Sequence, residues 1–338
     1  AVVPPPEETA VVKSFDETIV TNIGQPIKRK EDQRLLTGAG RFTDDFTMPN
    51  QSFASMVRSP YPHALINGID VTKALSMPGV LAVITSADIQ KAQLGPIPHN
   101  PVPSTNYDLK LRAPDGTHPI VDEHYLLPED RVRYVGEAVA MVIAESLEQA
   151  LDAVEAVIVD YVVLPHITES KDAILPDAPQ LYEHIEKNVL IDTQFGDEVL
   201  TEKAFASAVH IFEHEFHIQR VTGVTIEPRS ALGSYDINTG KFTLVAGSGG
   251  AVRQQSEIAA VLGIDSSDIR VISPDVGGNF GTRNRVYIEF GLVLFAARKI
   301  NRPVKFTATR TESFLTDYQG RDLVTHIALA LNADGKFL

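Results

Sequence analysis

Short apolar segments that suit β-strands alternate with helical segments along most of this sequence, and they fall into two blocks. In the first block, residues 131–146 contain two strand-like runs that are split at Gly136, and the spacing of residues 147–157 predicts an amphipathic helix. In the second block, a strand over 242–247 precedes a helix that is expected to end at Gly263, because glycine is favoured just after a helix C-terminus. This mixture of strands and helices predicts an α+β fold.

The pattern divides the chain into four segments, and 338 residues are enough for about two domains. Residues 1–20, which include three consecutive prolines, predict an extended tail with little to bury. Residues 21–167 form the first expected domain and residues 206–338 the second. The stretch between them, 168–205, is irregular and acidic, which is typical of a linker.

Composition and charge narrow the choice of partners. Hydrophobic residues make up 43% of the chain and charged residues 22%, which is ordinary for a globular protein. The chain has 30 Lys and Arg against 44 Asp and Glu, a net charge of −14, which argues against nucleic acid or an anionic membrane as the main partner. Since no apolar run approaches the roughly 18 residues of a membrane span, we expect no membrane insertion and a cytoplasmic location.

Cysteine is absent from the sequence. The chain therefore has no disulfide, no thiol nucleophile and no thiolate ligand for zinc or an iron–sulfur cluster. Any iron–sulfur centre that works with this protein is expected to lie on another chain.

The last residues predict a hairpin. Residues 323–332 have the composition of a strand, 333–335 suit a turn, and Phe337 and Leu338 are the first residues of a return strand. An unpaired strand edge exposes backbone donors and acceptors. We therefore expect another polypeptide to continue this sheet, and we expect the chain alone to be incomplete.

Two glycine-rich turns are candidate binding elements. The stretch 275–284, DVGGNFGTRN, places three glycines within five residues, and 246–252, AGSGGAV, lies between an expected strand and helix. Such glycines serve tight turns, or they let backbone N–H groups approach an anion, and the pattern alone leaves both readings open. A nicotinamide site is not expected, because Val252 stands where the dinucleotide fingerprint needs its third glycine. The two turns could converge on one anionic ligand.

Three histidines, His210, His214 and His217, lie close together in an expected strand. Residues three apart on a strand point to opposite faces, so His214 and His217 are poorly placed to share a metal ion. We therefore expect no direct metal ligand in this chain.

Taken together, several segments resemble the large, molybdenum-binding subunit of the xanthine dehydrogenase, aldehyde oxidase and aerobic carbon monoxide dehydrogenase family. RFTDDF, VRSPYPHALI, GVLAVITSADI and VRYVGEAVAMVIAES resemble its N-terminal α/β hammerhead domain. IEPRSALGSYD, RVISPDVGGNFGTRNRVYIE and RPVKFTATRTESF resemble the first part of its molybdopterin-binding region. The resemblance implies a hammerhead domain over 21–167 and an incomplete, mixed α/β molybdopterin-binding domain over 206–338.

The resemblance also implies which residues contact the cofactor. The second glycine turn would lie against the molybdenum end of the pterin, with a helix expected from Arg283 adding the positive end of its dipole. Members of the family often have a glutamine just ahead of the helix that here ends at Gly263. In this chain the first glycine turn occupies that place. The cofactor contacts implied in this chain are Gly277, Gly278, Asn279, Phe280, Gly281, Gly247, Ser248, Gly249 and Gly250.

The family reaction inserts water-derived oxygen at a C–H bond of a heteroaromatic or aldehyde substrate. The resemblance implies a molybdenum–molybdopterin cofactor in its cytosine dinucleotide form, an iron–sulfur small subunit with 2Fe–2S centres, an FAD medium subunit, and a chain carrying the rest of the molybdopterin domain. It assigns no catalytic residue to this chain. Glu227 lies in a segment expected near the cofactor domain, and Glu289 lies inside an expected helix, where a buried ion pair or a polar face explains it. The alternatives are a non-catalytic assembly subunit of the same fold and a free-standing domain that binds a small anion.

Overall fold

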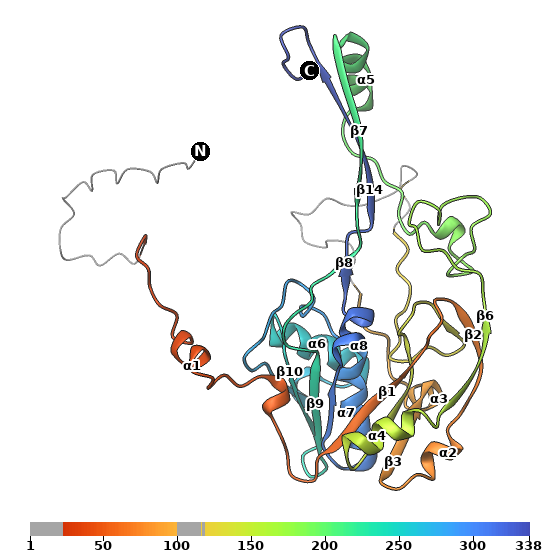
Figure 1. Ribbon diagram of the computed structural model, residues 1–338, viewed down its shortest axis with the longest axis vertical. Coiled ribbons are helices and arrows are strands. Elements are labelled where there is room, and N and C mark those ends of the chain that lie inside the picture. Colours follow the sequence, from red (N-terminus) through yellow and green to blue (C-terminus); the bar gives the residue numbers. More distant parts are fainter. Residues whose placement is uncertain (1–22, 100–115, 117–118) are drawn as a thin grey trace, which may run out of the picture. The chain divides into compact units, whose positions relative to one another are not determined.

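The computed structural model describes residues 23–99, 116 and 119–338 of a chain that forms two units, Ala1–Gly40 and Arg41–Leu338. The expected tail over 1–20 lies outside the described residues. Within the first unit, the described part contains helix α1 (Asp32–Leu36). Everything below concerns the second unit, whose elements are labelled in Figure 1.

A mixed seven-stranded sheet runs through this unit in the order β11-β10-β9-β12-β1-β5-β3. Its strands come from both expected domains, and the two groups meet where β1 pairs in parallel with β12, with Ser52 opposite Val304. The two expected domains thus share one sheet, and their boundaries at 167 and 205 stay a prediction. The strands are β1 (Ser52–Arg58), β3 (Val80–Thr85), β5 (Ala138–Ala144), β9 (Ser230–Asp236), β10 (Lys241–Ala246), β11 (Ile269–Ile272) and β12 (Val304–Thr307).

Two helices cover part of this sheet, α6 (Ala251–Leu262) and α7 (Ile288–Ile300) (Figure 1). Helix α7 is apolar and buried along most of its length and packs against β9, β10 and β12. It approaches β9 closely because Gly233 has no side chain: a Cβ there would lie 2.8 Å from the backbone of Val293. Helix α6 ends at Gly263, whose φ is 65°, as predicted.

Strand β5 lies between two apolar cores, since all of its residues are buried. Met141 and Ile143 belong to the core that contains α7, whereas Val139 and Val142 belong to a second core beneath α4 and a three-stranded sheet, β4-β2-β6. The predicted strand break at Gly136 is confirmed. The elements of this part are β2 (Ala64–Asp70), α2 (Thr72–Leu75), α3 (Ser86–Lys91), β4 (Arg131–Val132), α4 (Leu147–Val154) and β6 (Ile158–Val163).

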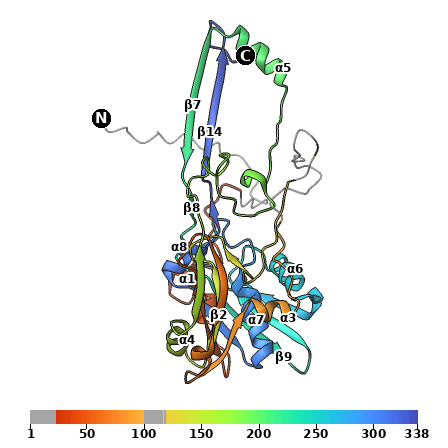
Figure 2. The same ribbon diagram turned by 90° about the vertical axis from the view of Figure 1, so that its right-hand side faces the viewer.

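The strands β7 (His210–Ile218) and β14 (Leu323–Leu331) pair antiparallel over their full length and form a ribbon of their own. Helix α5 (Glu198–Ser207) lies beside one end of this ribbon in both views (Figure 2). The predicted hairpin after β14 is confirmed, because Leu331 bridges to Phe337 around a turn in which Gly335 has a φ of 75°. A second short pair joins β8 (Val221–Thr222) and β13 (Gln319–Gly320).

Some expected element boundaries were wrong. The segment 168–205 is not irregular throughout, because α5 starts at Glu198, where the Asp197 side chain accepts the N–H of Leu200. Helix α7 starts at Ile288 and not near Arg283. A further helix, α8 (Arg310–Thr316), was not predicted. The described residues also form the short 3-10 helices η1 (Thr43–Asp45), η2 (Glu186–Asn188) and η3 (Ser266–Asp268).

None of the helices in the described ranges is both long enough and apolar enough to cross a membrane.

The turn between β4 and β5 places a carboxyl group in the interior. The backbone at Gly136 has a φ of 91°, and its carbonyl accepts a hydrogen bond from Arg58 Nη1 at 3.1 Å. The next side chain, Glu137, is only 9% exposed, and its Oε2 accepts the N–H of Arg133 at 2.5 Å. Burial raises the pKa of Glu137 to about 7, although the Arg133 N–H and guanidinium partly oppose the shift.

This raised pKa predicts a pH dependence of stability. Because the folded-state pKa lies above that of the unfolded chain, the fold loses stability as the pH rises from about 4.5 to about 7. Glu137→Gln keeps an oxygen for the Arg133 N–H and removes that loss. The variant should therefore be more stable than the wild type at about pH 8 and nearly equal to it at about pH 5. Thermal unfolding at both pH values measures this, and an equal difference at the two values would contradict it.

Candidate cofactor-binding site

The two glycine turns lie at the same edge of the sheet. Strands β10 and β11 are adjacent and parallel, with Phe242 opposite Ile269 and Val245 opposite Ile272, so their carboxyl ends point the same way. The first turn, 247–250, follows β10 directly and the second turn, 277–281, follows β11. In open sheets, loops at the carboxyl ends of parallel strands are the usual place for a ligand. The structure thus brings together all nine residues that the sequence predicts as cofactor contacts.

Direct contacts hold the two turns against each other. The N–H of Gly249 donates to the carbonyl of Arg283 at 3.2 Å. Asn279 organises the second turn, because its Oδ1 accepts the N–H groups of Gly281 and Arg283, both at 3.1 Å, and its amide donates to Asn284 Oδ1 at 2.9 Å. A Cβ on Gly249 would lie 1.9 Å from that same Oδ1. A Cβ at 249 would therefore displace the Asn279 and Asn284 side chains from their contact.

The three glycines of the second turn are also required by the chain itself. Gly278 has a φ of 119° and Gly281 a φ of 89°, which side chains rarely tolerate. A Cβ on Gly277 would lie 2.5 Å from Cβ of Glu227. The reading of these glycines as turn residues is thus correct, and it does not exclude a ligand.

Gly247 and Gly250 are different, because nothing in the described residues requires glycine there. A Cβ on Gly250 would meet no atom within 4 Å, and its φ of 179° is extended backbone that any residue adopts. A Cβ on Gly247 would be 3.6 Å from its nearest neighbour, an ordinary contact. Gly247 is buried, whereas the space beside the exposed Gly250 is open.

The second turn also offers free hydrogen-bond donors. The N–H groups of Gly278, Asn279 and Phe280 donate to no acceptor among the residues that the structure describes. The Phe280 side chain is 78% exposed, and its backbone has a φ of 47°. Successive N–H groups in such a turn form a concave site for an anion.

A helix N-terminus adds to this site, but it is not the one that we expected. Helix α7 begins at Ile288, because Tyr287 is extended and its hydroxyl donates to the carbonyl of Thr282 at 2.7 Å. Helix α6 instead begins at Ala251, immediately after the first turn, and its first N–H groups have no partner within the helix. The positive end of the α6 dipole therefore lies at the first turn.

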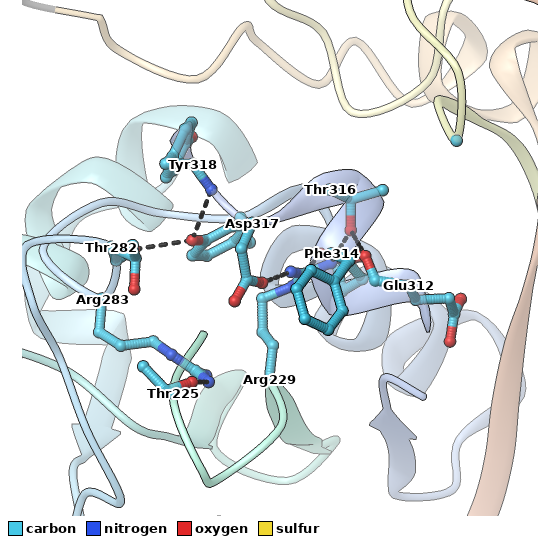
Figure 3. A network of polar contacts seen from close by, with 12 residues as sticks. Thr225, Arg229, Thr282, Arg283, Glu312, Phe314, Thr316, Asp317 and Tyr318 are labelled. Carbon is cyan, nitrogen blue, oxygen red and sulfur yellow. Dashed lines mark hydrogen bonds and ion pairs between the residues drawn. The ribbon is translucent and has the colours of Figure 1, made fainter. Parts of the chain in front are cut away.

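Arg283 ties the end of the second turn to the segment that contains Thr225 and Glu227. Its side chain is buried, and its guanidinium donates to Thr225 Oγ1 at 2.8 Å and to the carbonyl of Glu227 at 2.6 Å (Figure 3). Arg283 is therefore a support of the turn and not a residue facing a ligand.

A second buried guanidinium, that of Arg229, organises the neighbouring polar network. It donates to Glu289 Oε1 at 2.7 Å, to Thr316 Oγ1 at 2.7 Å and to Asp317 Oδ1, which points toward it in Figure 3. Arg58, from β1, adds a bond to Glu289 Oε1 at 3.0 Å. The expected buried ion pair at Glu289 is confirmed.

Burial alone would raise the pKa of Glu289, but the guanidinium groups of Arg229 and Arg58 lower it to about 2. A carboxylate that is paired twice and charged at neutral pH is a poor general base. The role of Glu289 is therefore to balance two buried cations.

A cavity of about 1640 Å³ in the described part of the chain lies apart from the predicted residues. Its lining includes His99, His124, Tyr134 and Glu137 and none of the nine predicted contacts. The rings of His99 and His124 stack, with Nε2 and Nδ1 2.9 Å apart, and burial lowers the pKa of His124 to about 4. The predicted cofactor contacts and this cavity are therefore separate features of the structure.

Comparison with known proteins identifies the two domains. Residues 37–165 match the aldehyde oxidase and xanthine dehydrogenase a/b hammerhead domain, and residues 181–338 match the molybdopterin cofactor-binding domain. The chain belongs to the aldehyde oxidase and xanthine dehydrogenase family. The predicted fold class, a hammerhead domain followed by part of a molybdopterin-binding domain, is confirmed.

Individual relatives share this arrangement. The 6-hydroxypseudooxynicotine dehydrogenase complex subunit gamma of Paenarthrobacter nicotinovorans is 32% identical over 94% of this chain and 38% of its own length. The carbon monoxide dehydrogenase large chain of Hydrogenophaga pseudoflava is 30% identical over 91% of this chain and 38% of its own. The crystal structure of quinoline 2-oxidoreductase from Pseudomonas putida 86 superposes with a TM-score of 0.83 at 31% identity, over 94% of this chain and 38% of that one. The chain therefore spans less than two fifths of the length of these family members.

The sequence alone did not reveal the residues that hold the second glycine turn in place. Glu227 and Arg229 were seen only as a segment near the cofactor domain, and Thr225 and Asp317 were not considered. Their partners lie far away in the sequence, so no local pattern could reveal them. The role of Asn279 had a local signal, since an asparagine two residues before a glycine suits a side-chain turn.

The Arg229 network leads to a stability prediction. Glu289→Gln keeps the shape of the side chain but leaves the Arg229 and Arg58 guanidinium groups short of one buried negative charge. Breaking a buried pair in this way typically costs about 3–5 kcal/mol of unfolding free energy. The matched control is Glu145→Gln, because Glu145 is 55% exposed and pairs with Arg302 at the surface, where a pair is worth about 1 kcal/mol or less. Denaturant titration compares the two variants, and a Glu289→Gln effect no larger than the control would refute the buried-pair account.

Proposed function

We propose that this chain forms part of a molybdenum hydroxylase and that its two glycine turns hold the molybdopterin cofactor. The enzyme would be an oxidoreductase that inserts water-derived oxygen at a C–H bond of a heteroaromatic or aldehyde substrate. The observation that supports this most directly is the set of three N–H groups at 278–280, which donate to no acceptor among the described residues and lie in a turn next to the start of α6. When bound, the cofactor would supply the redox centre that accepts electrons from the substrate.

The residues of this chain would act by binding and orientation. The N–H groups of the second turn and the α6 N-terminus suit the anionic groups of a pterin cofactor. The exposed ring of Phe280 would form an apolar wall that keeps water from one side of it. Both oxygens of Glu227 accept backbone N–H groups, and Glu289 is ion-paired, so we assign neither of them to proton transfer.

Further subunits belong to this proposal. Because the sequence has no cysteine, the 2Fe–2S centres would lie on an iron–sulfur small subunit. FAD would lie on a medium subunit, and the rest of the molybdopterin domain on further polypeptide. Relatives named as a large chain, a large subunit and a subunit gamma support a multi-subunit assembly. The names nicotine 6-hydroxylase and quinoline 2-oxidoreductase favour a heteroaromatic substrate. The cytoplasmic location stays a prediction.

A glycine-to-serine substitution tests whether a ligand occupies the first turn. Serine is a favoured N-cap, so Gly250→Ser should leave α6 intact, and a Cβ at this position meets no described atom within 4 Å. If the cofactor lies there, the added side chain should cost about 1–3 kcal/mol of binding and lower the molybdenum content per folded complex about five-fold or more.

The matched control is Gly68→Ser, since Gly68 is exposed in β2 and a Cβ there also meets nothing within 4 Å. Elemental analysis of both purified complexes gives the molybdenum content. Equal, full loading of the two variants would show that the first turn does not contact the cofactor. Absence of molybdenum from the wild-type complex would favour the non-catalytic assembly subunit.

The dinucleotide form of the cofactor is tested separately. Acid hydrolysis of the purified complex should release cytidine monophosphate in an amount equal to its molybdenum. Release of no nucleotide, or of another one, would correct the cofactor form and leave the proposed role of the turns unchanged.

A further inference from the structure

We propose that Glu227 is the positioning residue of the cofactor-binding turn and that it couples this turn to the RFTDDF segment of the hammerhead domain. The inference rests on the proposed function, because it takes the second glycine turn as the cofactor contact. It adds a residue and a partner segment to which neither the motif nor the fold assigns a role.

Glu227 forms hydrogen bonds with both the N–H and the carbonyl of Gly277. Its Oε2 accepts the N–H of Gly277 at 2.7 Å, and its own N–H donates to the Gly277 carbonyl at 3.1 Å. A hydrogen bond to a carboxylate is stronger than one between neutral groups. Gly277 immediately precedes the three free N–H groups, so its orientation determines where those groups point.

The other oxygen of Glu227 reaches the hammerhead domain. Oε1 accepts the N–H of Thr43 in η1 at 3.3 Å. The same two segments are joined again between Arg41 and Asp275, whose N–H groups each bond to the other residue, at 2.7 Å to the Asp275 carboxylate and at 3.0 Å to the Arg41 carbonyl. Glu227 therefore lies between the RFTDDF segment, 41–46, and the start of the cofactor turn.

Lys305 of β12 keeps the RFTDDF segment in place. Its side chain is 7% exposed, and its Nζ lies 3.0 Å from Asp44 Oδ1 and donates to the Phe46 carbonyl at 3.2 Å. The segment is thus tied to the central sheet and gives Glu227 a fixed support.

Glu227 also lies beside the first turn. A Cβ on Gly247 would be 3.6 Å from Glu227 Oε2 and 3.8 Å from Thr43 Oγ1. That hydroxyl is buried and has no hydrogen-bond partner within the part of the chain that the structure describes. One carboxylate therefore binds the second turn and the segment that braces it, and lies beside the first turn.

Because both carboxylate oxygens are bound to backbone N–H groups, Glu227 acts through the turn and not on the substrate. Its loss would leave the N–H groups of Gly277 and Thr43 without acceptors and free the turn to move. A purely structural role of Glu227 would affect only the stability of the fold. The proposed positioning role also predicts a change at the bound cofactor when Glu227 is substituted.

The test uses the intact complex, purified with its partner chains, and a matched pair of carboxylates. Glu137 is the control, since it is also 9% exposed and also accepts a backbone N–H, but it lies in the hammerhead turn. Glu227→Ala should lower the molybdenum content per folded complex about ten-fold, as expected for loss of a charged hydrogen bond, whereas Glu137→Ala should keep wild-type loading. Glu227→Gln retains an acceptor for Gly277 and should restore loading to within about three-fold of wild type.

A spectroscopic readout covers the case in which Glu227→Ala fails to fold. In Glu227→Gln, the molybdenum electron paramagnetic resonance spectrum of the partly reduced complex should differ from the wild type, whereas Glu137→Gln should give the wild-type spectrum. Full loading and an unchanged spectrum in the Glu227 variants would overturn the inference. If Gly250→Ser loses molybdenum while the Glu227 variants keep it, this inference alone fails; if Gly250→Ser also keeps it, the proposed function fails.

Discussion

The arrangement of this site depends on the ion pairs that the buried guanidinium of Arg229 makes. It pairs with Glu289 of α7 and with Asp317 after α8, and Arg58 of β1 joins the same cluster. Charges that are removed from water in this way cannot separate without a large cost. Arg229 also follows Glu227 by two residues, so the network that fixes the one helps to fix the other. The shared sheet and the cofactor turn are therefore stabilised together.

The glycine-rich turns serve the fold and the ligand at different positions. A Cβ on Gly277 would clash with Glu227, and one on Gly249 would displace the Asn279 and Asn284 side chains. Gly278 and Gly281 supply backbone angles that other residues avoid. Only Gly247 and Gly250 remain without a reason in the chain itself. A count of glycines would therefore overstate the direct contacts to a cofactor, and the proposal rests instead on the N–H groups at 278–280 and the open side of Gly250.

The sequence predicted the elements with strong local signals. Buried β5, the break at Gly136 and the end of α6 at Gly263 all follow from periodicity and glycine placement. Helices α5 and α8 were missed although each has a capping residue, Asp197 and Thr309, because α5 buries none of its residues and α8 has only 7 residues. The pairing of β1 with β12 and the contacts of Glu227 join residues that are distant in the sequence. Nothing in a single sequence encodes such contacts locally, so the supports of the site appeared only in the structure.

The most direct test of the account is a cryo-electron microscopy map of the intact complex in which the cofactor is visible. The account predicts pterin density within hydrogen-bond distance of the N–H groups at 278–280 and against the open side of Gly250, with the Glu227 carboxylate still bound to Gly277. A cofactor that is bound away from both glycine turns would contradict it.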